Sequence, residues 1–244
     1  MDVPLERWPP ALDGLRVAVV ADLHTGGPHV GERKLERIVA TVNAARPDLV
    51  ALVGDYADPT GPLGEPVAPE RVAELLGGFD APLGVFAVLG NHDWHHYGER
   101  VPRALRASGV EVLENDAVTV EPGGQVFWVA GLADMRQRRA DVTVALAMVP
   151  ASQPLIALTH DPDMFPQLRD RADVTLAGHT HGGQVGLPLV RRATAPSRHG
   201  YTGGEVREAG GYMYVSRGVG TTGLPIRFAA PPEIALLRLR AGLA

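Results

Sequence analysis

Five short apolar runs, each followed directly by polar side chains, constrain the fold of this chain more than any other feature. Each run has the length and residue types of a buried β-strand, and they cover residues 15–20, 49–53, 84–89, 155–158 and 174–177. Helical spacing of apolar residues follows the first run through 31–45, and further helices are expected near 70–76 and at 99–108. This alternation predicts an α/β fold that begins with parallel βα units.

The pattern changes after residue 110. Short β-type runs are expected at 110–113, 117–120, 125–130, 212–216 and 233–239, with one more helix at 141–148. We expect these later strands to pair mostly antiparallel. Together with the parallel units, they fit two packed sheets with helices outside. No linker divides the chain, so a single domain over 1–244 is predicted.

The polar islands after the five strands hold seven potential metal ligands. They are Asp22-Leu23-His24, Gly54-Asp55, Gly90-Asn91-His92-Asp93, Thr159-His160-Asp161 and Gly178-His179-Thr180-His181. Because loops at the carboxyl ends of strands converge on one crevice, these islands are expected to pool their Asp, His and Asn side chains. That mixture of oxygen and nitrogen ligands suits a divalent metal ion.

Spacing within the islands supports a shared site. Asp22 and His24 are two residues apart, so at an extended strand end both side chains would face the same side. His179 and His181 have the same spacing and could flank different ions. The carboxylate of Asp55 could bridge two ions.

Taken singly, each island also has an ordinary structural explanation. Asn91, His92 and Asp93 could cap a helix or fill a turn, and a histidine such as His160 at a strand end is more often a satisfied polar residue than a ligand. Gly178-His179-Thr180-His181 is the most specific of the five. Their joint occurrence, each after an apolar strand, favours a metal-centred hydrolase.

Composition narrows the remaining classes. The 244 residues carry a formal net charge of −5 and no cysteine, which disfavours nucleic acid as a partner and excludes thiolate chemistry. The start of the chain lacks the basic and apolar regions of a signal peptide, and no apolar run approaches the ~18 residues of a membrane helix. The sequence therefore predicts a soluble, cytoplasmic protein without a membrane segment.

The five islands, in this order, resemble the full signature of the calcineurin-like metallophosphoesterases, over residues 15 to about 185. Gly182-Gly183-Gln184 and the later Pro225-Ile226-Arg227-Phe228 resemble a bacterial subgroup of that family. Many relatives in the subgroup carry an N-terminal membrane segment or export signal, from which this chain departs.

The resemblance implies a four-layer αββα sandwich, with two mixed β-sheets flanked by helices and two divalent metal ions at the strand ends. Its implied ligand set for one ion is Asp22, His24, Asp55 and His181, and for the other Asp55, Asn91, His160 and His179. His92 would bind substrate or donate a proton, and Asp93 would orient its ring. The nitrogen and oxygen ligands fit Mn²⁺, Fe or Zn²⁺.

The predicted reaction is hydrolysis of a small phosphorylated substrate, a phosphodiester or phosphomonoester, by in-line attack of a metal-bridging hydroxide. The alternative within the enzyme class is a pyrophosphohydrolase of a nucleotide-linked sugar or lipid precursor. A lipid substrate would require an exposed apolar cleft, and the sequence shows no convincing one. A catalytically silent metal-binding scaffold would be expected to lack ligands, and none is missing here.

Overall fold

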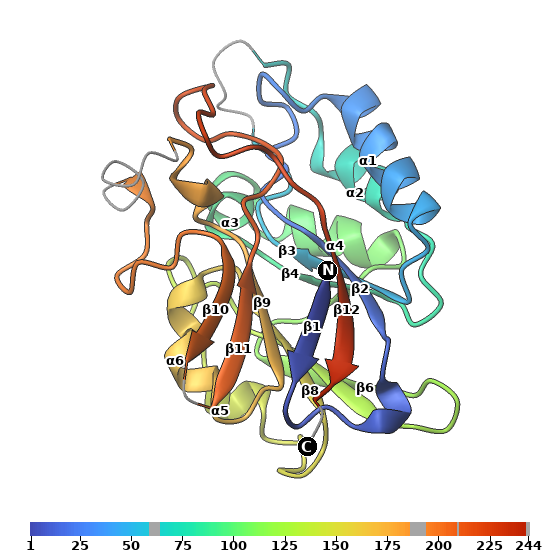
Figure 1. Cartoon of the computed structure of the whole chain (residues 1–244). Coiled ribbons are helices and arrows are strands. Elements are labelled where there is room, and N and C mark those ends of the chain that lie inside the picture. Colours follow the sequence, from blue (N-terminus) through green and yellow to red (C-terminus); the bar gives the residue numbers. More distant parts are fainter. Residues whose placement is uncertain (59–63, 186–193, 209, 243–244) are drawn as a thin grey trace.

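The computed structural model describes residues 1–58, 64–185, 194–208 and 210–242 (Figure 1). Its first sheet has the strand order β1-β12-β2-β3-β4-β5. These strands are β1 Asp2–Leu5, β2 Arg16–Val20, β3 Leu49–Val53, β4 Val85–Val88, β5 Glu111–Val112 and β12 Ala235–Ala241. Strands β2 to β5 pair in parallel, as the βα pattern predicts, and β12 joins antiparallel to β2 and parallel to β1.

The second sheet has the order β10-β11-β9-β8-β7-β6. Its strands are β6 Asp116–Val120, β7 Phe127–Gly131, β8 Leu155–Leu158, β9 Val174–Ala177, β10 Gly204–Glu208 and β11 Gly211–Val215. The expectation of mostly antiparallel pairing is wrong here, because β7, β8, β9 and β11 pair in parallel. Helices α5 and α6 lie between β7, β8 and β9 in the sequence, and such crossovers return the chain to the same end of the sheet.

Side chains of each central strand alternate between two apolar layers. Val17 and Val19 of β2 belong to the core between the sheets, whereas Ala18 and Val20 face the helices of the first sheet. The core between the sheets also contains Leu49 of β3 and Ile156 of β8. Strands buried on both faces explain why the sequence shows continuous apolar runs rather than strict alternation.

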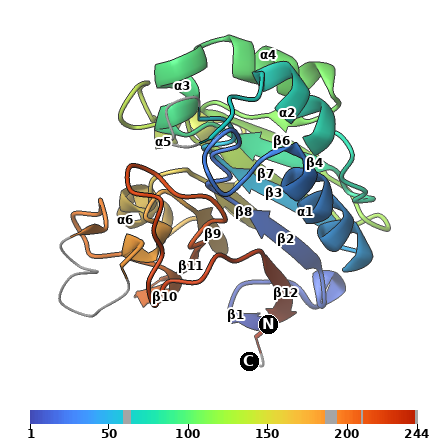
Figure 2. The same cartoon turned by 90° about the horizontal axis from the view of Figure 1, so that it is seen from above.

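Helices cover the outer face of both sheets (Figures 1 and 2). Against the first sheet pack α1 Glu32–Ala44, α2 Pro69–Leu76 and α4 Arg100–Ala107. Against the second pack α5 Val142–Ala145 and α6 Phe165–Leu168. The layers therefore follow the order αββα, which confirms the expected sandwich of two mixed sheets flanked by helices.

Several elements differ from the sequence prediction. The helix expected at 141–148 shrinks to α5, where the Asp141 carboxylate accepts a hydrogen bond from the Val144 amide (3.1 Å). The edge strands β1 and β10 and the short helix α3 Asn91–Tyr97 were not expected. Shorter 3-10 turns occupy Pro10–Leu12, Pro162–Met164 and His181–Gly183.

The parallel strands β2, β3, β4, β8 and β9 end at the same side of the molecule, so all five polar islands lie there. Among the described residues, none of the helices is both long and apolar enough to cross a bilayer.

Candidate metal centre

The backbone of the candidate ligands is left-handed at five positions. Asp22 and His24 have φ of 49° and 44°, Asp55 has 58°, and His179 and His181 have 72° and 52°. The expectation that Asp22 and His24 flank an extended residue is therefore wrong. Hydrogen bonds still join the two strand ends, because the Asp22 amide donates to the Gly54 carbonyl (2.9 Å) and the His24 amide to the Asp55 carbonyl (3.0 Å).

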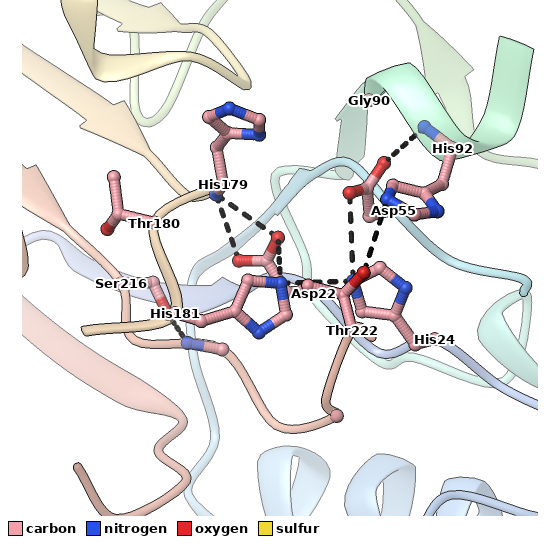
Figure 3. Close-up of polar contacts among 12 residues, drawn as sticks. Asp22, His24, Asp55, Gly90, His92, His179, Thr180, His181, Ser216 and Thr222 are labelled. Carbon is pink, nitrogen blue, oxygen red and sulfur yellow. Dashed lines mark hydrogen bonds and ion pairs between the residues drawn. The ribbon is translucent and has the colours of Figure 1, made fainter. Parts of the chain in front are cut away.

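One cluster of side chains consists of Asp22, His24 and His181 (Figure 3). The Nε2 atoms of His24 and His181 lie 3.1 Å apart, and His181 Nε2 lies 3.5 Å from a carboxylate oxygen of Asp22. The His179 amide donates to both oxygens of Asp22, at 3.1 and 3.0 Å, which holds this carboxylate in the cluster.

A second cluster consists of Asp55, His160 and His179. His160 Nε2 lies 3.3 Å from Asp55 Oδ2 and 3.1 Å from His179 Nδ1. Asp55 connects the two clusters, because the same Oδ2 atom lies 3.6 Å from His24 Nε2. The His92 amide donates to the other oxygen of Asp55 at 2.9 Å.

Hydrogen bonds at the far side of two rings determine which nitrogen carries the proton. His160 Nδ1 lies 2.8 Å from the Val53 carbonyl oxygen, which can only accept, so Nδ1 donates. His24 Nδ1 is similarly 3.2 Å from the Asp58 carboxylate. The Nε2 lone pairs of both rings therefore face the cluster, as they do in metal-ligating histidines whose other nitrogen is hydrogen-bonded.

Lone pairs and carboxylates that converge at 3.1–3.6 Å repel one another unless a cation or a proton lies between them. The pKa of His160 shows this demand for positive charge. Burial alone would lower the pKa of His160, but the carboxylates of Asp55 and Asp22 raise it to about 10. Burial, with the charge of His160, lowers the pKa of His179 to about 2, and burial raises that of Asp22 to about 6.

Asn91, the first residue of α3, supplies a further candidate ligand. Its buried amide oxygen has no hydrogen-bond partner among the described residues, and neither does Nε2 of His179. A buried acceptor without a partner costs about 1–3 kcal/mol, so a site of this kind normally contains a group that satisfies it. The residues present thus fit divalent metal ions.

His92 lies beside this centre on α3, with a partner that the sequence analysis missed. Its Nδ1 is 3.4 Å from the carboxylate of Asp58, which also contacts His24. Burial would lower the pKa of His92, but the nearby carboxylate of Asp58 and the charge of Asp55 raise it. No pattern in the sequence singles out Asp58, which precedes His92 by 34 residues.

The ring-orienting role expected of Asp93 stays a prediction, and its hydrogen bonds in the structure are with backbone amides. Its carboxylate accepts hydrogen bonds from the amides of Gly90 (2.9 Å), Asp55 (2.8 Å) and Tyr56 (2.9 Å). It therefore fixes the start of α3 against the end of β3, whereas Asp58 is the carboxylate beside the His92 ring. This acceptance from the Gly90 amide is the N3 half of a capping box.

Glycines allow these loops to approach closely. A Cβ on Gly54, where φ is 95°, would lie 2.5 Å from His160 Nδ1 and 2.7 Å from the Gly90 amide. A Cβ on Gly90 would overlap the carboxylate of Asp55. Side chains at either position would push the two clusters apart.

A second phosphate group on the substrate would require basic side chains near the clusters. Arg136 pairs with Asp161 at 3.0 Å, and Asp161 in turn lies 3.7 Å from His179 Nε2. Arg138 covers the ring of Trp94 at 4.3 Å and pairs with Glu114 at 2.7 Å. Arg191 and Arg192 fall outside the described residues.

Two adjoining clusters of candidate metal ligands lie at the carboxyl ends of strands in two packed sheets. The chain belongs to the calcineurin-like phosphoesterases, whose family model matches residues 15–183. It is a phosphoester hydrolase by this membership, and the family implies divalent metal ions as cofactors.

Individual relatives agree with this assignment. An uncharacterized metallophosphoesterase of Bacillus subtilis, YkuE, is 33% identical over 95% of this chain and 81% of its own. A transmembrane protein with a metallophosphoesterase domain from Danio rerio is 34% identical over 98% of this chain, which spans only 56% of that protein. The UDP-2,3-diacylglucosamine pyrophosphatase LpxG of Chlamydia trachomatis is 26% identical over 93% of this chain and 84% of its own.

The fold is also found among solved structures. A hypothetical protein from Thermus thermophilus aligns with a TM-score of 0.52 over 86% of this chain and 77% of its own, at 21% sequence identity. The likeness at this identity concerns the fold.

Proposed function

We propose that this protein hydrolyses phosphoesters with two divalent metal ions that share Asp55. Asp22, His24 and His181 would complete the ligands of one ion, and Asn91, His160 and His179 those of the other. The observation that supports this most directly is the convergence of imidazole lone pairs and carboxylates into two clusters joined by Asp55 Oδ2.

The ions would supply Lewis acidity and a hydroxide nucleophile at neutral pH. Asp22 and Asp55 return about −2 against the +4 of two divalent ions, so roughly +2 remains to attract a phosphate. The exclusively nitrogen and oxygen ligands favour Mn²⁺, Fe or Zn²⁺. Asp22 and Asp55 are held by the amides of His179 and His92, so their carboxylates are oriented before substrate arrives.

His92 is the proposed proton donor. When the phosphorus–oxygen bond breaks, the leaving alkoxide needs a proton, and a positioned acid provides about 10²–10⁴-fold in rate. Asp58 beside Nδ1 raises the pKa of His92, which favours the protonated ring, whose Nε2 would supply the proton for the leaving group. Nε2 also lies 3.4 Å from the Thr222 hydroxyl, at the side of the ring away from Asp58.

Phosphodiesters and activated phosphomonoesters are the proposed substrates. The second candidate is cleavage of a pyrophosphate in a nucleotide-linked sugar or lipid precursor, which the similarity to the pyrophosphatase LpxG favours. Both reactions require the same attack on phosphorus, but a phosphate leaving group needs less protonation than an alkoxide.

The test is turnover of bis-p-nitrophenyl phosphate and p-nitrophenyl phosphate by protein stripped with a chelator and reloaded with Mn²⁺, Zn²⁺ or Fe²⁺. We expect activity only after reloading, with about two ions per chain by elemental analysis. Binding of a single ion at full activity would contradict the dinuclear proposal. Two bound ions without turnover of these esters or of a UDP-linked pyrophosphate would favour the silent scaffold.

A further inference from the structure

Exposed apolar side chains gather on one segment next to the two clusters of candidate ligands. In the described part of the chain, seven large hydrophobic residues are exposed, and three of them, Leu224, Ile226 and Phe228, fall within five residues. They are 69%, 56% and 57% exposed. Isolated exposed apolar residues are ordinary, whereas a cluster of them marks a surface that binds something apolar.

The segment 224–228 is held firmly rather than left as a free loop. The amide of Phe228 donates to the Gln184 carbonyl (2.8 Å), and the Gln184 side chain bonds the amide and carbonyl of Thr222 at 2.8 and 2.9 Å. Gln184 follows the candidate ligand His181 by three residues, so these bonds tie the segment to the metal-site loop.

Arg227 explains why its neighbours point outward. Its half-buried guanidinium donates to the carbonyls of His181 (3.3 Å), Arg217 (2.8 Å) and Gly220 (2.9 Å). Because Arg227 turns inward, Ile226 and Phe228 on either side of it are exposed. Both positions lie on the surface and yet carry apolar side chains.

A pocket of about 450 Å³ lies between this segment and the candidate ligands. Its walls include the candidate ligands His179 and His181 and the apolar residues Val185, Pro196, Leu224 and Ile226. A volume of this size, with mostly apolar walls and a few polar groups, is typical of small-molecule sites. No such apolar cleft is evident in the sequence, because its walls come from three separate loops.

We propose that this pocket binds an alkyl or acyl chain of the substrate while its phosphate lies at the metal centre. The inference rests on the proposed function and narrows it to phosphate esters or pyrophosphates with an apolar organic group. Removing each methylene of such a chain from water favours binding by up to about fourfold. The pocket would therefore contribute selectivity for long chains over short ones.

The experiment compares p-nitrophenyl alkyl phosphodiesters with methyl, butyl and octyl chains, all below their micellar concentrations. The leaving group is constant, so only the chain differs. We expect kcat/KM of the metal-loaded protein to rise roughly 10²-fold from methyl to octyl. Leu224→Ser and Ile226→Ser should each reduce the octyl-to-methyl ratio by about tenfold.

Val144→Ser is the matched control, because Val144 is 57% exposed but lies on α5, against the second sheet. It should leave the octyl-to-methyl ratio unchanged.

A second arm presents a hexadecyl ester in phosphatidylcholine vesicles and tests Phe228→Ser. A loss of turnover confined to vesicles would indicate a chain taken from a lipid surface, and no such loss would indicate a chain taken from water.

Failure of the apolar pocket can be distinguished from failure of the proposed function. Equal kcat/KM for methyl and octyl esters, with metal-dependent turnover intact, would overturn the apolar pocket and leave the proposed function standing. No turnover of any ester by protein that holds two ions would remove the proposed function, and this inference with it.

Discussion

The candidate ligands combine a left-handed backbone with short polar side chains. For most residue types this conformation costs about 1–2 kcal/mol, but Asp, Asn and His adopt it more readily. Five such residues here direct their side chains inward from strand ends. Asp22 and His24 lie in the same cluster, as their two-residue spacing predicts. The cause is their left-handed backbone and not the extended strand end that the prediction assumed.

His92→Ala tests the proton donor at the residue scale. We expect kcat to fall about 10²–10⁴-fold for an ester with an alkoxide leaving group, because no acid then protonates it. The loss should be much smaller for p-nitrophenyl esters, whose leaving group needs little protonation. Steady-state kinetics on both esters measures the difference, and equal losses would contradict the assignment.

Asp58→Asn removes the negative charge beside His92 and keeps the side-chain size. Asp58 raises the pKa of His92, so its loss lowers that pKa, and the acid is deprotonated at lower pH. The alkaline limb of kcat/KM against pH should therefore move to lower pH. The profile is measured at saturating metal, because Asp58 also bonds His24 and metal affinity is expected to fall about 10–100-fold. An unmoved limb would exclude this positioning role.

At the scale of elements, the ends of β3, β4 and β8 lie very close together. A Cβ atom at Gly54, after β3, or at Gly90, after β4, would overlap a neighbouring loop.

The central strands could be predicted to within one or two residues at most ends, because they are apolar and bounded by polar islands. Strand β10, with the sequence Gly-Glu-Val-Arg-Glu and mixed exposure, lies at a sheet edge and carries no comparable apolar signal. The pairing direction of the second sheet depended on the short helices α5 and α6, which have little sequence periodicity.

Gly90→Ala should weaken the centre, because its Cβ would overlap the Asp55 carboxylate. We expect a loss of about 1–3 kcal/mol in the free energy of unfolding and a lower metal affinity. Chemical denaturation and metal titration measure both. Gly31→Ala is the matched control: Gly31 also precedes a helix, has φ −94° against −96° for Gly90, and has open space around it. Similar losses in both variants would contradict a specific clash at Asp55.

At the scale of the whole molecule, both sheets contribute to one central core and to one candidate site. Side chains from β2, β3, β8 and β9 belong to the same apolar cluster, and the His160 ring from the second sheet bonds Val53 of the first. The terminal strand β12 pairs with β1 and β2. We infer that residues 1–244 form a single cooperative domain.

Metal removal should therefore destabilise the entire chain and not one half of it. At a free metal concentration of 100 times Kd, binding adds about 2.7 kcal/mol, which corresponds to roughly 5–11 °C in Tm for a chain of this size. Differential scanning calorimetry should show one transition for the apoprotein and one at higher temperature after reloading. Two transitions, of which metal shifts only one, would contradict a single cooperative domain.

The sequence by itself determined the order of the central strands along the chain and the candidate ligands, because each ligand follows an apolar run and parallel strands end at one edge. Only the tertiary structure decided which carboxylate lies beside His92, since Asp93 is its neighbour in sequence, whereas Asp58 precedes it by 34 residues and reaches the ring only through the fold. The apolar pocket also depends on the tertiary structure. Its walls at Val185, Pro196, Leu224 and Ile226 come from separate loops, which meet only when they pack beside His179 and His181.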